Sequence, residues 1–155
     1  MDIRLDPVKP HEKDTLFRLL QYSLFEESAT DLNEMNGEAI FDYPWFELYF
    51  TDADRWAYII REQETDKLLG FVMVKTREGY PGYMIAEFMV IPKYRRNGIG
   101  RRAATACFDR FRGEWEVSPA FGSETAYQFW KGVIDSYTDG NNRFEDRKFL
   151  FCNAK

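Results

Sequence analysis

Residues 87–102 have the sequence EFMVIPKYRRNGIGRR, and the order of residue types in this stretch predicts the fold around it. An apolar run at 83–91 is typical of a buried strand, and Pro92 ends it. A turn with five basic residues and two glycines follows at 93–102. Apolar residues then recur at every fourth position, which predicts a helix over about 98–112. The stretch therefore predicts a strand, a basic turn and a helix.

The turn in the middle of this stretch has the features of an anion-binding site. Gly98 and Gly100 allow a ligand to approach the backbone closely. The start of the helix offers unpaired N–H groups and the positive end of the helix dipole. Arginine side chains add charge-assisted, bidentate contacts to phosphate oxygens. The turn thus predicts a site for a pyrophosphate-like group, and the alternative is an ordinary surface turn that is basic.

Two common nucleotide-binding motifs do not account for the turn. The Walker A pattern, with Lys-Ser or Lys-Thr after its last glycine, is absent. The segment 98–103 does match the dinucleotide pattern G-x-G-x-x-A, and Glu116 lies 18 residues beyond Gly98. However, only about 50 residues follow the motif, too few for the remaining βαβ units of a dinucleotide-binding domain.

The rest of the chain predicts more strands and helices around one sheet. Strands are predicted at 2–8, 55–61, 67–76, 114–118 and 147–152, and helices at 14–25 and from the N-cap candidate Ser123 to about 138. Part of the stretch 26–54 predicts a further helix. A chain of 155 residues without internal repeats suits one domain, 1–155. The order of elements predicts a mixed α/β fold.

Composition excludes several classes of protein. A net charge of −5 argues against general nucleic-acid binding, and no apolar run is long enough to span a membrane. The first residues lack the apolar core of a signal peptide, so a cytoplasmic location is expected. One histidine, His11, and two isolated cysteines predict no metal site. Cys107 and Cys152 both lie in apolar stretches, and we expect two buried thiols.

The charges are segregated along the chain. The stretch 26–54 holds nine acidic residues and no Lys or Arg, whereas 93–102 holds five basic residues and no acid. Six aromatic residues also fall within 41–50: Phe41, Tyr43, Trp45, Phe46, Tyr49 and Phe50. Carboxylates and aromatic faces together attract and hold cations. This pattern favours a cationic ligand, and the alternative is a core-packing helix with a solvated acidic face.

Residues 95–100, RRNGIG, resemble the [Q/R]-x-x-G-x-[G/A] motif of the GNAT superfamily of acetyl-CoA-dependent N-acetyltransferases. The preceding residues 90–95, VIPKYR, are similar to the usual lead-in of that motif, V-x-P-x-Y-R. The segment 123–126, SETA, stands where members often have N-x-x-A. The likeness is strongest over 85–135, and it is closest to a branch of predicted acetyltransferases that carry Glu-Phe-Phe-Val and Phe-Trp at these places.

This resemblance implies a fold and a cofactor site. The fold would be a single domain with a central mixed, mostly antiparallel sheet, splayed between its fourth and fifth strands, and helices on both faces. Backbone groups of the fourth strand would pair with the pantetheine arm of acetyl-CoA, and the turn would hold its pyrophosphate. The implied cofactor-binding residues are Phe88, Met89, Val90, Arg95, Arg96, Asn97, Gly98, Ile99, Gly100, Arg101, Ser123 and Trp130.

Three side chains are candidates for the catalytic groups. An amine acceptor is protonated near neutral pH and must lose a proton before it attacks the thioester. Glu87, a carboxylate in an apolar strand, is the first candidate for the base; Glu116 and water are the alternatives. Many members of the resembled family use a tyrosine as general acid where this chain has Trp130, and Tyr127, one turn earlier, is the candidate substitute.

These observations predict an enzyme that transfers an acetyl group from acetyl-CoA directly to a small-molecule or peptide amine, without a metal. Two other functions stay open. The chain could use another acyl-CoA, or it could bind acyl-CoA without catalysis, which the loss of the usual tyrosine at Trp130 would favour. A homodimer is compatible with the aromatic content, and no nucleic-acid or membrane partner is expected. The sequence does not name the acceptor.

Overall fold

One seven-stranded sheet runs through the molecule, as seen in a computed structural model that describes residues 1–154. The strands follow the order β1-β2-β3-β4-β5-β7-β6. Their bounds are β1 (Ile3–Pro7), β2 (Arg55–Glu62), β3 (Leu68–Thr76), β4 (Tyr83–Val90), β5 (Glu114–Val117), β6 (Arg143–Glu145) and β7 (Lys148–Cys152). All neighbours pair antiparallel except β4 and β5, which are parallel. The predicted mixed, mostly antiparallel sheet is confirmed.

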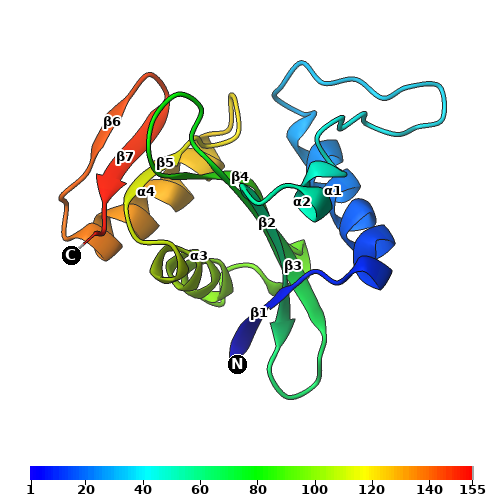
Figure 1. Ribbon diagram of the computed structural model, residues 1–155, viewed down its shortest axis with the longest axis horizontal. Coiled ribbons are helices and arrows are strands. Elements are labelled where there is room, and N and C mark those ends of the chain that lie inside the picture. Colours follow the sequence, from blue (N-terminus) through cyan, green and yellow to red (C-terminus); the bar gives the residue numbers. More distant parts are fainter. Residues whose placement is uncertain (155) are drawn as a thin grey trace.

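Helices cover both faces of the sheet, as predicted. They are α1 (Lys13–Glu27), α2 (Leu48–Thr51), α3 (Ile99–Arg110) and α4 (Glu124–Thr138), with short 3-10 turns at Pro10–Glu12 and Pro92–Tyr94. Figure 1 shows α1 and α2 on one side of the sheet and α3 and α4 on the other. Within residues 1–154, no helix is long and apolar enough to cross a membrane.

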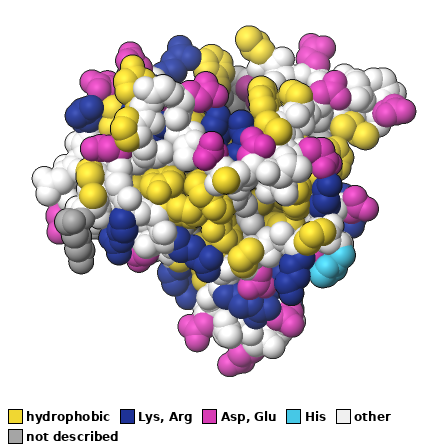
Figure 2. Space-filling view, in the orientation of Figure 1, with side chains coloured by type: hydrophobic (Ala, Val, Ile, Leu, Met, Phe, Trp, Pro, Cys, Tyr) yellow, Lys and Arg dark blue, Asp and Glu magenta, His cyan; other side chains and the backbone are white. Residues whose placement is uncertain are grey.

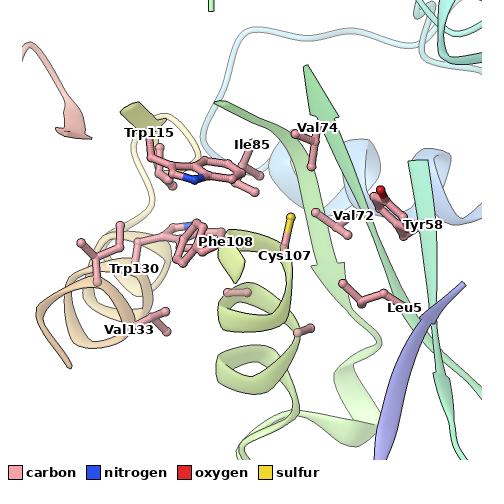
Figure 3. Packing of buried hydrophobic residues seen from close by; sticks show 14 of the residues in the cluster. Leu5, Tyr58, Val72, Val74, Ile85, Cys107, Phe108, Trp115, Trp130 and Val133 are labelled. Carbon is pink, nitrogen blue, oxygen red and sulfur yellow. The ribbon is translucent and has the colours of Figure 1, made fainter. Parts of the chain in front are cut away.

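Each face of the sheet carries its own core because side chains alternate along the strands. In β3, Phe71 and Met73 pack against α1 and α2, whereas Val72 and Val74 pack against α3 and α4. Figure 3 shows the second core, where α3 contributes Phe108 next to Trp130 of α4. Burial of these large apolar side chains is the main stabilising contribution to the fold.

The sheet splays open between β4 and β5. These strands pair only at Tyr83 with Trp115 and at Met84 with Glu116. A β-bulge at Ala86 shifts the register of β4 against β3, and bulges of this kind bend a strand and increase its twist. The remainder of β4 therefore has no strand partner on its β5 side. The splay that the resemblance implied is confirmed.

The further helix predicted within the acidic stretch is present but short. Besides the end of α1, only α2, four residues long, is helical there, and residues 28–47 form turns and loop. Local hydrogen bonds compete with a helix there, because Asp31 accepts from the backbone N–H of Asn33 and Asn36 accepts from that of Glu38. Figure 2 shows acidic side chains gathered over this loop, at the upper right in the orientation of Figure 1.

Two more predictions need correction. Cys107 is buried as expected, but Cys152 is exposed because alternation along β7 turns Phe151 inward and its neighbour outward. The strand β6 was not predicted. It is joined to β7 by a tight turn at Asp146 and Arg147, both with positive φ, and such turns are usually recognised by Gly or Asn.

Candidate active site

A cavity of about 740 Å³ opens where the sheet splays. Its walls come from four parts of the chain: the end of α1 and the turn after it, the last residues of β4, the turn at 95–101, and α4. The strand–turn–helix stretch thus forms one side of the cavity, and the acidic segment begins on the opposite side. Ten of the twelve predicted cofactor-binding residues line this cavity, and the other two, Asn97 and Ile99, flank Gly98 in the turn.

The turn presents backbone N–H groups at the start of α3. Gly98 caps the helix with a φ of 76°, and a Cβ on it would meet no atom within 4 Å. The first backbone bond of the helix runs from the N–H of Arg102 to the carbonyl of Gly98, at 3.1 Å. The N–H groups between them, those of the first helical turn, are free to bind an anion in the open space.

Gly100 has a different role from Gly98. A Cβ at this position would lie 2.8 Å from the ring of Phe129, closer than atoms approach without a shift. This glycine lets α3 and α4 pack closely. Only the first of the two glycines in the motif therefore faces open space.

The arginines of the turn divide into two kinds. The Nε of Arg95 donates to the carbonyl of Val90 at 2.8 Å, and its two Nη atoms donate to the carboxylate of Glu26 at 2.7 and 2.9 Å. Arg95 therefore joins the turn to the end of α1. Arg96 and Arg101 line the cavity and form no ion pair within residues 1–154, so their charges are available to a ligand.

An apolar wall lies beyond the turn. Phe88, Met89 and Val90 of β4 line the cavity together with Trp130 of α4. Phe88 and Val90 share a core with Trp130, and the rings of Phe88 and Trp130 are 5.0 Å apart in edge-to-face geometry. Ser123 also lines the cavity, and its Oγ caps α4 by accepting from the N–H of Ala126 at 3.1 Å. The predicted N-cap is thus present at the edge of the site.

Glu87 is a partly buried carboxylate on β4; it directly precedes Phe88 in the strand, although it does not itself line the cavity. Burial, with a further contribution from the nearby carboxylate of Glu27, raises the pKa of Glu87 to about 8. The hydroxyl of Tyr43 donates to its Oε2 at 3.1 Å and opposes that rise. A carboxyl group with a pKa near neutral can take up a proton and release it during a reaction.

Sequence reasoning assigned no role to Glu27 or Tyr43. Glu27 ends α1 and lines the cavity, and burial together with the charges of Asp31 and Glu26 raises its pKa to about 7. Both residues belong to the acidic, aromatic segment that predicted a cationic ligand. Their link to Glu87 spans at least 44 residues of sequence, so no local motif could have shown it.

The other two catalytic candidates lie elsewhere. Glu116 is 13% exposed and pairs with Arg77 at 3.3 Å and with Lys148 at 3.5 Å, which neutralises its charge. Tyr127 packs its ring against Phe149 and Phe144 of the β6–β7 hairpin. Neither residue lines the cavity that holds Phe88 and Trp130. Within residues 1–154 no cluster of His, Cys, Asp or Glu could hold a metal ion.

Solved structures of acetyltransferases share this fold. An acetyltransferase from Thermus thermophilus matches 97% of this chain and 94% of its own at 16% identity, with a TM-score of 0.66. A spermidine N-acetyltransferase from Vibrio cholerae, solved in complex with CoA and spermine, matches 97% of this chain and 95% of its own at 8% identity, with a TM-score of 0.66. At these identities the likeness shows the fold.

Comparison with the sequence patterns of protein families is more specific about membership than the likeness to solved structures. No curated protein gives a significant match to the chain. The sequence pattern of the acetyltransferase (GNAT) family, however, matches residues 21–130, which include the second half of α1, the splayed strands, the basic turn and most of the cavity. The chain therefore belongs to the GNAT family of acetyltransferases.

Proposed function

We propose that this protein uses acetyl-CoA to acetylate a cationic amine, with Glu87 as the general base. The observation that carries the proposal is the cavity, which joins an anion-binding turn to the carboxylate of Glu27 and to Phe88, the residue that follows Glu87 in β4; both carboxylates have a raised pKa. The spermidine N-acetyltransferase of Vibrio cholerae, with its bound CoA and spermine, supports an amine as acceptor. The family supports transfer of an acetyl group.

The residues around the cavity fit acetyl-CoA. Its pyrophosphate would lie against the first-turn N–H groups of α3 and the unpaired Arg96 and Arg101. The edge of β4 that has no strand partner offers backbone groups to the amides of the pantetheine arm. Bound there, acetyl-CoA supplies a reactive thioester.

Glu87 would make the acceptor nucleophilic. An alkylammonium group entering beside this carboxylate gives it one proton, and the neutral nitrogen then forms the bond to the acetyl carbon. As the carbon–sulfur bond breaks, the acetylated nitrogen loses a second proton, which the departing thiolate takes up. A thiol of ordinary pKa, about 8.5, is an adequate leaving group without a general acid, so Tyr127 is not required.

The charge around Glu87 favours a cation over a neutral acceptor. Nine acidic residues and no Lys or Arg occur in 26–54, and Glu27 and Asp31 of this segment lie near Glu87. A partly buried group of like charges is unfavourable until a counter-charge arrives. The acceptor ammonium group would provide that counter-charge.

Calorimetry with acetyl-CoA tests the cofactor site. We expect micromolar-range binding by the natural sequence, and a loss of at least about tenfold in the double variant Arg96→Ala/Arg101→Ala, because two charge-assisted phosphate contacts are removed. The control Arg143→Ala removes an exposed arginine of β6 and should bind normally. Unchanged binding in the double variant would contradict the cofactor site. Normal binding without turnover of any amine would favour a non-catalytic acyl-CoA-binding protein.

A further inference from the structure

The carboxylate of Glu87 is held at one oxygen only. The hydroxyl of Tyr43, 44 residues earlier in the chain, donates to Oε2 of Glu87 at 3.1 Å, and Oε1 has no hydrogen-bond partner within residues 1–154. In that part of the chain the Tyr49 hydroxyl is the only side-chain oxygen or nitrogen that lacks a partner and is shut off from solvent, so Oε1 of Glu87 is open to solvent. One oxygen of Glu87 is therefore anchored and the other is free.

The partner of Glu87 is a neutral group. Within residues 1–154 no Lys or Arg forms an ion pair with Glu87, whereas Glu116 pairs with both Arg77 and Lys148. A cationic partner stabilises the charged form of a carboxylate and makes it a weaker base. The hydroxyl orients Glu87, and burial outweighs its effect on the charge, so the pKa of Glu87 stays raised. This pairing suits a group that must be held in place and still accept a proton.

A β-bulge turns Glu87 toward Tyr43. Ile85 belongs to the core on the α3 and α4 face, and strict alternation along β4 would turn Glu87 to that face as well. The bulge at Ala86 shifts the register, so that Glu87 lies opposite Met73 of β3. Met73 packs on the α1 and α2 face of the sheet, and so does Tyr43. The irregular strand thus brings the carboxylate to the face that carries its donor.

The loop that carries Tyr43 is fixed on both sides of this residue. Gln21 of α1 binds the backbone of Phe41 twice, donating to its carbonyl and accepting from its N–H, both at 2.8 Å. Phe41 is itself buried in the core on this face. Pro44 follows Tyr43 and disfavours helical backbone angles there, and the ring of Trp45 packs edge-to-face on that of Tyr43, 5.4 Å away. These contacts hold the Tyr43 hydroxyl in place.

We propose that Tyr43 is a positioning residue, which holds Oε2 of Glu87 so that Oε1 takes the proton of the acceptor amine. This inference rests on the proposed role of Glu87 as base and adds the residue that orients it. As the proton moves to Oε1, the N–H bond of the ammonium group breaks and the nitrogen keeps the electron pair for its attack on the acetyl carbon. Tyr43 keeps its own proton, because burial and the charge of Glu87 raise the pKa of its hydroxyl.

The pH dependence of kcat/KM with one cationic amine tests this role. Tyr43→Phe removes only the hydroxyl, whose hydrogen bond lowers the pKa of Glu87, so the midpoint near pH 8 should rise by about half to one unit. The other groups that act on this site, Glu27, Asp31 and Tyr49, are unchanged in the variant. Above the midpoint kcat should fall about three- to tenfold, because the carboxylate is less well oriented.

A matched control and a double variant show whether Tyr43 acts through Glu87. Tyr22→Phe removes a hydroxyl from a tyrosine that is exposed on α1, and it should keep the natural midpoint and kcat. In a Glu87→Gln background, adding Tyr43→Phe should change kcat by less than about twofold. An unchanged midpoint in Tyr43→Phe, or an equal loss of kcat with and without Glu87, would overturn the proposal.

Urea unfolding of the same variants gives a readout that does not depend on turnover. Tyr43→Phe should lose more stability at pH 9, where Glu87 is charged, than at pH 5, where it is protonated, and Glu87→Gln should abolish this difference. If no amine is acetylated, the proposed function fails, while this pH-dependent loss still shows that Tyr43 holds the charged form of Glu87. A loss of equal size at both pH values would show that the hydroxyl does not act on this charge, and would overturn the proposal.

Discussion

The protonation of Glu87 is set by two opposing effects. Burial and the carboxylate of Glu27 raise its pKa to about 8, while the hydrogen bond from Tyr43 lowers it. The pKa of Tyr43 is itself raised, by burial first and by Glu87 second, so its hydroxyl stays neutral and remains a donor. A base of this pKa is half in its active form near pH 8.

Replacing Glu87 with glutamine should remove one limb of the pH–rate profile. In the natural sequence, kcat/KM should rise as pH increases through about 8, because the carboxylate form of Glu87 appears there. The Glu87→Gln variant should lack this limb and lose about 100-fold in kcat, keeping only the rise due to ionisation of the amine. Initial rates between pH 6 and 10 check this. A profile with the same midpoint in both proteins would exclude Glu87 as the base.

The same carboxylates should make stability depend on pH. In the folded protein the pKa values of Glu27 and Glu87 are about 7 and 8, against an ordinary glutamate pKa of 4.5, so the folded state holds protons that the unfolded state has lost. Stability should therefore fall as pH rises from about 4.5 to 8. Glu87→Gln should raise the free energy of unfolding above pH 8, by on the order of a few kcal/mol, and leave it unchanged near pH 4.

Urea unfolding of Glu87→Gln and of Glu34→Gln at three pH values measures this effect. A gain in stability that is as large at pH 4 as at pH 9 would show that the carboxylate of Glu87 is not destabilised by burial. The exposed control should show no gain at either pH.

Among the secondary-structure elements, the end of α1 is tied to the cofactor turn by one ion pair. Arg95 holds Glu26 with two hydrogen bonds, and the loop before α4 touches the turn after α1, where a Cβ on Gly122 would lie 3.1 Å from Thr30. The acidic carboxylate of Glu26 thus lies on the wall of the cavity that would take the phosphates.

Glu26→Gln should tighten acetyl-CoA binding. The change removes a negative charge from the cavity wall and frees the guanidinium of Arg95, so we expect a two- to tenfold lower Kd, about 1 kcal/mol. The melting temperature should change little, because an exposed ion pair contributes roughly 0–1 kcal/mol. Calorimetry measures the affinity for acetyl-CoA. Weaker binding by the variant would contradict this prediction and show that the ion pair between α1 and the turn supports acetyl-CoA binding.

Alanine at either glycine of the motif should destabilise the fold, for a different physical reason at each position. Gly100→Ala should destabilise the fold by about 1–3 kcal/mol, since its Cβ would meet the ring of Phe129. Gly98→Ala meets no neighbour but must hold a positive φ, which costs about 1–2 kcal/mol. Denaturant unfolding compares the two variants. Unchanged stability in Gly100→Ala would show that α3 and α4 do not need the glycine contact.

Local sequence patterns predicted the secondary-structure elements that form the site. They could not predict the side-chain pairs that join residues far apart in the chain. The strand, turn and helix around Gly98 follow from contiguous residues, as does the N-cap at Ser123. The partners of Arg95 and Glu87 lie 69 and 44 residues away, at Glu26 and Tyr43, so no motif could pair them. The predicted second helix is only four residues long, and the hydrogen bonds of Asp31 and Asn36 hold part of the preceding stretch in turns.

Over the whole molecule, the net charge of −5 combines a basic turn and an acidic segment that meet at one cavity. The basic side suits the phosphates of acetyl-CoA, and the acidic side suits a cation. Within residues 1–154, one ion pair joins the basic turn to the acidic segment, that of Arg95 with Glu26. The two ligands would neutralise both sides together.

The release of free CoA from acetyl-CoA, measured as initial rates over a set of cationic, neutral and acidic amines, is the decisive measurement for acetyl transfer to a cation. We predict that cationic amines give the highest kcat/KM, and that each CoA released matches one acetylated amine. Added salt should reduce the preference for cations, because screening weakens their attraction. Highest kcat/KM with neutral or acidic acceptors, or no turnover of any amine, would contradict this function.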